Sequence, residues 1–203
     1  MRRGLFWLAR RPIAQAAVRH AFAHLAWAIP VRRVYETATV LAFHHPRPSW
    51  PTHVLVVPKR AVPSLLALDD LGLVDEVVAA ARTAAVRLGL AEAPLTLLVN
   101  GGAWQDVGQL HFHLITGDDD LWLPSVGGLR PGELSPHPEP RRATHLVVAG
   151  PIRAGVAAAR ERARSIAPAG FALALCGRGL GELDCVHLIA GAPRRSLERC
   201  ASP

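Results

Sequence analysis

The sequence predicts an α+β fold: an antiparallel sheet with a helix packed on one face, extended by a C-terminal strand-helix-strand-strand block. Segments rich in Val, Leu and Ile recur at strand length, and an alanine-rich segment between them has helical spacing. The resulting order of strand, strand, helix, strand and strand is typical of an antiparallel sheet covered by one helix. The predicted segments are 34–43, 52–59, 74–88, 95–99 and 107–115.

The N-terminal third contains one helix and two strand segments. Residues 13–28 are alanine-rich with apolar positions near helical spacing, and Pro30 ends the helix that they predict. Residues 34–43 alternate well enough for one strand or a hairpin. Three prolines within the next segment, 46–51, exclude a helix or a central strand there. Residues 52–59 are almost continuously hydrophobic, which favours a strand buried on both faces.

The middle of the chain changes to helical periodicity and then returns to strands. Ser64 can cap a short helix, and residues 74–88 contain strong helix formers before Gly89, a natural C-terminal signal. Residues 117–142 are rich in Gly, Pro and charges, which predicts a loop that links two ordered blocks. The expected division is a first domain over 1–120 with its N-terminal helix, a linker loop over 121–142 and a C-terminal extension over 143–203.

Composition excludes several function classes. The formal net charge is +7, but the arginines are scattered and Lys59 is the only lysine, so the charge indicates a compositional bias and nucleic-acid binding is unlikely. Three cysteines near the end of the chain form no disulfide framework and favour a reducing compartment. No segment reaches the length of a membrane span. We therefore expect a cytoplasmic protein without a membrane partner.

Polar residues at every second position mark residues 107–115 as a functional strand. On a strand, Gln109, His111 and His113 project to one side, while apolar residues between them project to the other. The preceding turn consists of Asn100 and two glycines. Because glycine has no side chain, the backbone of this turn can approach a ligand closely. Two imidazoles and an amide beside such a turn predict a site.

The C-terminal block repeats short parts of the first. THVLVVPKR at 52–60 is similar to THLVVAGPIR at 144–153, and QLHFHLITG at 109–117 is similar to LDCVHLIAG at 183–191. The second match pairs His113 with His187 and His111 with Cys185. Short apolar matches also arise by chance, so a degenerate half-repeat and a coincidence both stay open.

Two motifs resemble the histidine-triad (HIT) superfamily of nucleotide hydrolases and transferases. Residues 105–113 read Gln-Asp-Val-Gly-Gln-Leu-His-Phe-His, against the signature Gln-x-Val-x-His-x-His-x-His. Upstream, LAFHHPRPSWPTHVLVVPKR resembles the superfamily's LAF-x-D-x-x-P-x-x-P-x-H-x-L-V-x-P-K pattern without a gap. The resemblance covers about residues 20 to 120 and implies a HIT-like sheet. It departs from the pattern at four positions: Gln109 replaces the first triad histidine, His45 a carboxylate, Asp106 a Ser or Thr, and Ala61 a histidine that many members have.

The resemblance also implies residue roles. His111, the middle residue of the triad, is the expected nucleophile, and His113 is expected to contact the phosphate and assist the leaving group. The other expected catalytic or nucleotide-binding residues are Gln105, Gln109, Asn100, Asp106, the supporting His53, and the base- and ribose-contacting Phe43, His44, His45 and Pro46.

The implied reaction passes through a covalent nucleotidyl-histidine and needs no metal or other cofactor. The implied partner is a nucleotide or nucleotide conjugate, bound by a homodimer or by an intramolecular pseudo-dimer. Two alternatives stay open: a HIT-fold module that binds a nucleotide with little or no turnover, and a metal site built from His111, His113, His53 and His44.

Overall fold

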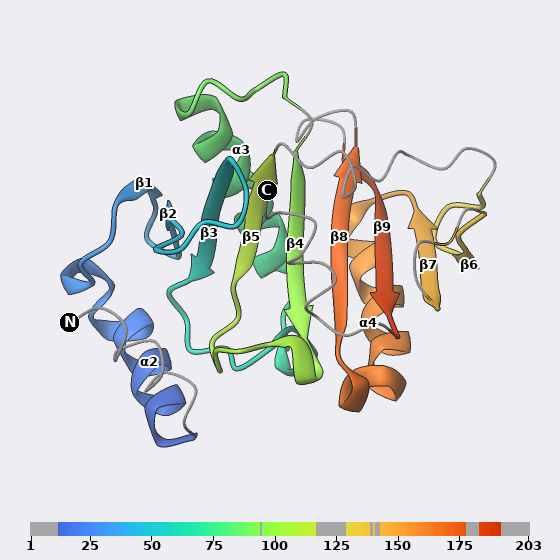
Figure 1. Cartoon of the computed structure of the whole chain (residues 1–203), viewed down its shortest axis with the longest axis horizontal. Coiled ribbons are helices and arrows are strands. Elements are labelled where there is room, and N and C mark those ends of the chain that lie inside the picture. Colours follow the sequence, from blue (N-terminus) through green and yellow to red (C-terminus); the bar gives the residue numbers. More distant parts are fainter. Residues whose placement is uncertain are drawn as a thin grey trace.

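All the strands of the described residues belong to one continuous antiparallel sheet. The computed structural model describes residues 12–93, 95–116, 129–138, 140, 143–177 and 183–191. Within them, nine strands follow the order β1-β2-β3-β5-β4-β8-β9-β7-β6 (Figure 1). Every pair of neighbouring named strands is antiparallel. The predicted α+β class, an antiparallel sheet with packed helices, is confirmed.

The N-terminal segments form a helix and a hairpin. The helix predicted over 13–28 ends earlier, and a 3₁₀ turn covers most of the remainder. The segment predicted as one strand or a hairpin is a hairpin, because the Thr37 hydroxyl accepts the backbone N–H of Val40 at 2.9 Å and closes the turn. The elements are α2 (Pro12–His24), η1 (Ala26–Ala28), β1 (Arg33–Glu36), β2 (Val40–His44) and β3 (Thr52–Pro58).

The central elements agree with the prediction except at the last strand. Ser64 caps a short 3₁₀ helix by accepting the Ala67 N–H. The strand predicted over 107–115 begins only at Phe112, because the Leu110 N–H donates to the Val62 carbonyl at 2.7 Å and binds this segment to a loop. The elements are η2 (Leu65–Ala67), α3 (Gly72–Arg87), β4 (Thr96–Gly101), η3 (Gly102–Trp104) and β5 (Phe112–Thr116).

The C-terminal elements include one strand that the sequence does not predict. β6 lies in the segment predicted to be a linker loop and pairs with β7, a partner that only the tertiary structure provides. The rest of that loop through residue 128, with Asp118–Asp120, and the residues after 191 lie outside the described residues. The elements are β6 (Leu134–Pro136), β7 (Thr144–Ala149), α4 (Ile152–Ile166), η4 (Ala167–Ala169), β8 (Phe171–Gly177) and β9 (Leu183–Ala190).

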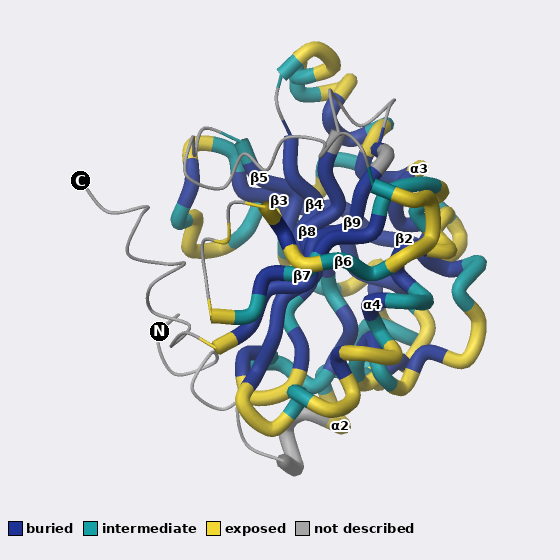
Figure 2. Tube along the Cα trace, turned by 90° about the vertical axis from the view of Figure 1, so that its right-hand side faces the viewer, coloured by how far each residue is buried: buried dark blue, intermediate teal, exposed yellow. Residues whose placement is uncertain are grey.

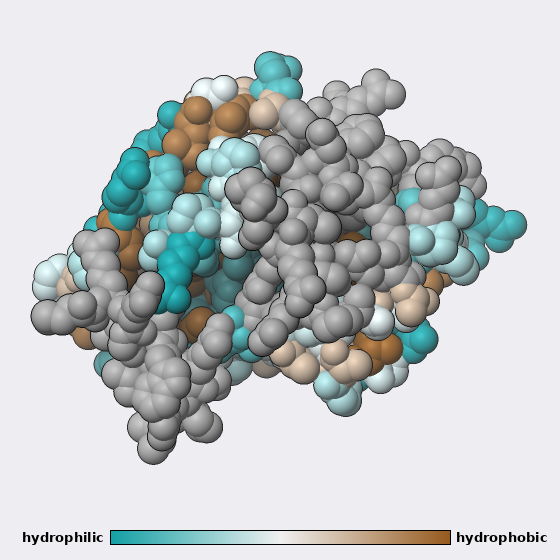
Figure 3. Space-filling model, in the orientation of Figure 1, coloured by the Kyte–Doolittle hydropathy of each residue, from teal (hydrophilic) through white to brown (hydrophobic). Residues whose placement is uncertain are grey.

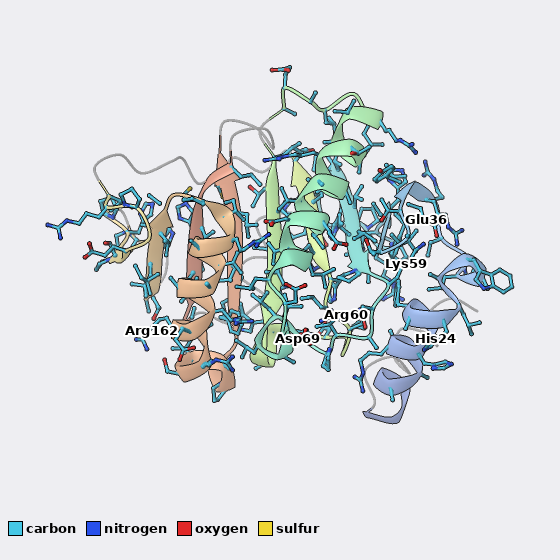
Figure 4. All side chains as sticks on the ribbon, turned by 180° about the vertical axis from the view of Figure 1, so that it is seen from behind. His24, Glu36, Lys59, Arg60, Asp69 and Arg162 are labelled. Atoms are coloured by element: carbon cyan, nitrogen blue, oxygen red, sulfur yellow. The ribbon has the colours of Figure 1, made fainter. Side chains whose placement is uncertain are left out.

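Helices α3 and α4 cover the same face of the sheet, as Figures 1 and 4 show from opposite sides. The main core lies between this face and the small apolar residues of the helices, including Val77 and Ala81 of α3 and Val156 and Ala159 of α4. The strands are buried along most of their length, whereas exposed residues concentrate in the connections (Figure 2). The other face of the sheet is therefore the one available for a site.

The sheet consists of two halves with mirrored strand order. Reading outward from its centre gives β4-β5-β3-β2 in one direction and β8-β9-β7-β6 in the other. Leu98 pairs with His113 in the first half, and Ala174 pairs with His187 in the second. Leu98 and Ala174 also pair with each other, which places an internal twofold axis at this pair. The short sequence matches therefore correspond to a structural repeat.

The glycine turn after β4 contacts the second half. A Cβ on Gly101 would lie 2.1 Å from the Phe171 ring, and one on Gly102 would lie 1.9 Å from the Ala167 carbonyl oxygen. Gly170 has the same constraint against the Trp104 ring, also at 2.1 Å. The close approach expected at this turn is thus made to the C-terminal half of the chain.

Charged residues mark the outer ends of the sheet. Next to β6, Arg130 pairs with Glu133, and the surface there is hydrophilic in Figure 3. At the other end, Lys59 pairs with Glu36 at 2.7 Å (Figure 4). Charges at sheet edges discourage pairing with other chains. None of the helices in the described part of the chain has the length and apolarity required to cross a membrane.

Candidate active site

Four imidazoles meet on the sheet face opposite the helices. Their neighbours on the strands, such as Val54 and Phe112, belong to the helix-side core, so strand alternation directs the histidines to the other side. The His45 ring stacks on that of His53 with 4.0 Å between centroids. The His113 ring lies 5.1 Å from His53 and 5.0 Å from His111. The fold therefore brings these four predicted site residues together.

Hydrogen bonds fix the tautomers of His53 and His113. The Ser49 backbone N–H donates to His53 Nδ1 at 3.2 Å, so the neutral ring carries its proton on Nε2. His53 Nε2 lies 2.8 Å from His113 Nδ1 and donates to it, which leaves the proton of neutral His113 on its own Nε2. Burial lowers the pKa of His53 to about 3, and the neighbouring His45 and His111 act in the same direction. His53 is therefore neutral at physiological pH.

His111 has the tautomer of a nucleophile. Its Nδ1 lies 2.8 Å from the backbone carbonyl oxygen of Gln109. A carbonyl oxygen only accepts, so Nδ1 carries the proton and the lone pair is on Nε2. His111 is partly exposed, whereas the side chain of His113 is buried. A basic nitrogen on one ring thus stands beside an N–H donor on the next.

Gln109 is buried and turned toward the backbone. Its Nε2 donates to the carbonyl oxygens of Pro58 and Arg60, both at 3.0 Å. Its Oε1 is buried and has no hydrogen-bond partner within the described ranges. Because β5 begins at Phe112, Gln109 precedes the strand, and its side chain joins the entry of β5 to the end of β3.

Asn100, Gln105 and Asp106 lie in or after the glycine turn that precedes β5. Asn100 lies on β4 opposite Ala172 of β8 and is partly exposed. The Gln105 amide donates to the Pro63 and Val107 carbonyls at 2.6 and 2.7 Å, which shapes the loop before His111. Asp106 follows in the same loop and is partly exposed.

The β2 end contributes residues to both faces of the sheet. Phe43 is buried and stacks on Phe22 of α2, with 6.2 Å between ring centroids. Strand alternation directs His44 to the opposite face from Phe43, away from the imidazole cluster. Burial and the charge of Arg32 lower the pKa of His44. Pro46 is exposed in the following loop.

Sequence reasoning missed two contributors to the cluster. Trp50 lies edge-on to the His53 ring at 4.8 Å between centroids, and its burial helps to exclude water. The Ser49 backbone N–H, which fixes the His53 tautomer, belongs to no side-chain motif. The tryptophan was present in the matched upstream segment, but its contact with His53 depends on how the proline-rich loop folds back.

The buried imidazoles predict a loss of stability in acid. Burial lowers the pKa of His45 to about 4 and that of His53 to about 3, whereas both groups titrate near 6.5 when unfolded. Above pH 6.5 the two states bind equally few protons and the shifts have no effect. Below it the unfolded state binds protons first, so the free energy of unfolding falls by about 1.4 kcal/mol per pH unit for each group.

Urea unfolding at pH 7 and pH 5 measures this fall. A His53→Asn variant, which has lost one of the two groups, should show a smaller difference between the two pH values. An identical pH dependence in the wild type and the variant would contradict the assignment of a neutral, buried His53.

Comparison with known proteins agrees with this geometry. A family model described as HIT domain matches residues 27–120. A HIT-like protein of Synechocystis is 36% identical over 100 residues, which are 47% of this chain and 87% of the relative. A HIT-like protein of Azospirillum brasilense is 39% identical over 101 residues, covering 44% and 77%. The chain therefore belongs to the HIT family.

A solved structure extends the likeness into the C-terminal half. The yeast Ap4A phosphorylase Apa2, solved in complex with AMP, matches 87% of this chain and 64% of its own, with a TM-score of 0.52 and 12% identity. At this identity the match concerns the fold alone. Its coverage includes the second half of the sheet, beyond the region that the family model matches.

Proposed function

We propose that this chain is a nucleotidyl hydrolase or transferase that acts at the α-phosphate of a nucleotide conjugate through a covalent nucleotidyl-His111. The observation that carries the proposal is the bond from His111 Nδ1–H to the Gln109 carbonyl, which makes Nε2 the basic nitrogen. Membership of the HIT family supports it.

In the proposed reaction His111 Nε2 attacks the α-phosphorus, a new P–N bond forms, and the bond from phosphorus to the leaving group breaks. His113 Nε2–H donates a hydrogen bond to the phosphate or to the leaving group, which departs as an anion and takes any proton it needs from solvent. Water then attacks the phosphorus, breaks the P–N bond and releases a nucleoside monophosphate. Another acceptor in place of water gives transfer.

The donor chain from Ser49 through His53 supports the role of His113. Each bond in this chain fixes the next tautomer without requiring any ring to be charged. A hydrogen-bond donor is thereby held on the ring next to that of His111. Asn100, Gln105, Asp106 in the loop before β5 and His45 in the loop after β2 are proposed to contact the nucleotide, because they border the cluster in sequence and in the sheet.

Gln109 is proposed as a positioning residue. Its backbone carbonyl holds His111, and its side chain holds that backbone in place through Pro58 and Arg60. A non-titrating residue can perform this role. The glutamine at the first triad position is therefore compatible with turnover.

Replacing Gln109 by alanine should lower both stability and turnover. The change removes two hydrogen bonds to backbone carbonyls, one buried and one partly buried, and we expect the free energy of unfolding to fall by about 2 kcal/mol. If the backbone at 109 positions His111, kcat should fall more than KM rises. Gln109→His, which retains a ring N–H donor, is the matched control. Unchanged kcat in Gln109→Ala would exclude a positioning role.

Trapping the covalent intermediate tests the proposed function. The full chain is mixed with a dinucleoside polyphosphate or a nucleoside phosphoramidate, quenched at short times and digested for mass spectrometry under conditions that preserve P–N bonds. We expect a nucleoside monophosphate adduct on the peptide that contains His111. Binding of the nucleotide without adduct or product would instead identify a binding module.

A further inference from the structure

The second half of the sheet repeats the imidazole cluster of the first. His137 follows β6, His145 lies on β7 and His187 on β9, at the positions that His45, His53 and His113 occupy in the first half. The His137 and His145 rings stack with 4.1 Å between centroids, against 4.0 Å for the first pair. His145 Nε2 lies 3.0 Å from His187 Nδ1.

The position of the nucleophile differs between the two halves. Strand register places Cys185 where the first half has His111, and Cys176 where it has Asn100. Cys185 Sγ lies 3.3 Å from His187 Nε2. The second cluster therefore retains three imidazoles but lacks the histidine that would form a covalent intermediate, and it is free to serve another purpose.

We propose that His137, His145 and His187 form a binding site for a divalent transition metal ion of the Zn²⁺ class. Their ligand nitrogens all lie within 4.8 Å of one another, and all three side chains are buried. Within the described residues, no other group of three or more His, Cys, Asp or Glu side chains meets this condition. The proposal concerns the C-terminal half and does not depend on the reaction proposed for His111.

The distance between His145 and His187 suits a tetrahedral ion. With Zn–N bonds of about 2.0 to 2.1 Å, two nitrogens on one ion lie about 3.3 Å apart. The 3.0 Å between His145 Nε2 and His187 Nδ1 needs to open by only about 0.3 Å. His187 then binds through Nδ1, and its Nε2–H donates to Cys185 Sγ, as the second ring nitrogen of a metal-bound histidine usually donates to a neighbour. Three imidazoles leave the fourth position open.

Backbone donors hold the corresponding rings of the first half. His45 Nδ1 accepts the Arg47 N–H at 3.0 Å and His53 Nδ1 accepts the Ser49 N–H, so both rings are fixed by backbone donors. The two halves provide matched positions, and metal binding is proposed for the second, whose three ligand nitrogens all lie within 4.8 Å of one another.

Metal titration of the full chain, purified without a polyhistidine tag and stripped with a chelator, tests the proposal. We expect about one equivalent of Zn²⁺ by equilibrium dialysis, visible absorption bands of tetrahedral Co²⁺, and a higher melting temperature with the ion. His145→Asn and His187→Asn should abolish all three effects. His53→Asn and His113→Asn, the same changes at the matched positions, should retain them.

His137→Gln provides a second test if burial makes the strand variants unstable, since His137 lies just beyond β6. This variant should lose the Co²⁺ bands while its far-ultraviolet circular dichroism without metal stays that of the wild type. Absence of stoichiometric binding to the wild type would overturn the proposal. So would binding that survives in His145→Asn and His187→Asn, or that is lost equally in His53→Asn and His113→Asn.

Discussion

His111→Ala should reduce turnover of a nucleotide conjugate by at least about 10⁴-fold, because it removes the atom that forms the covalent intermediate. The alanine retains the backbone through Phe112 into β5, so the fold should persist. Nucleotide affinity should change far less than kcat. Steady-state kinetics and equilibrium binding on the same preparation measure the two effects.

His24→Asn is the matched control for this prediction. His24 is an exposed histidine at the end of α2 (Figure 4), and its ring contacts that of His20 on the same helix. The control should retain wild-type kcat and the adduct on the His111 peptide. Turnover by His111→Ala within tenfold of the wild type would exclude nucleophilic catalysis by this residue and favour a different reaction at the same cluster.

Gly102→Ala should destabilise the protein by about 3 kcal/mol or more. Gly102 has φ of +58°, which disfavours any residue with a Cβ, and the added carbon would lie 1.9 Å from the Ala167 carbonyl oxygen. Neither backbone segment can yield independently, because η3 packs against η4 where the two halves of the sheet meet. Denaturant unfolding measures the loss.

Gly89→Ala separates the two causes of this loss. Gly89 has φ of +71° but nothing within 4 Å of an added Cβ, so this variant should lose only about 1 to 2 kcal/mol from backbone strain. The difference between the variants reports the packing of the halves. Equal losses would show that contact at the junction contributes little to the stability of the chain.

Gln109 shows most clearly what local sequence patterns cannot predict. Periodicity placed it on the strand face with His111 and His113, a prediction that treated 107–115 as regular. Local alternation cannot reveal that the Leu110 N–H finds its acceptor at Val62, or that the Gln109 amide finds two at Pro58 and Arg60. These partners are about 50 residues away in sequence and are adjacent only after β3 and β5 pair.

β6 shows the same limit. Residues 134–136 contain a proline and no apolar alternation, so nothing local distinguishes them from the surrounding loop. They form a strand because β7 presents an unpaired edge to them. Edge pairing of this kind depends on backbone hydrogen bonds, which any sequence other than a run of prolines can supply.

The sequence by itself determined the order of most helices and strands, the face of β5 that carries imidazole, and the family. Those features depend on periodicity and on residue types at fixed spacing, which are local properties. Only the tertiary structure decided the tautomer of each histidine, the mirrored assembly of the two halves and the second imidazole cluster. These depend on contacts between segments far apart in sequence, because a hydrogen bond or a shared cavity exists only when folding has brought its partners together.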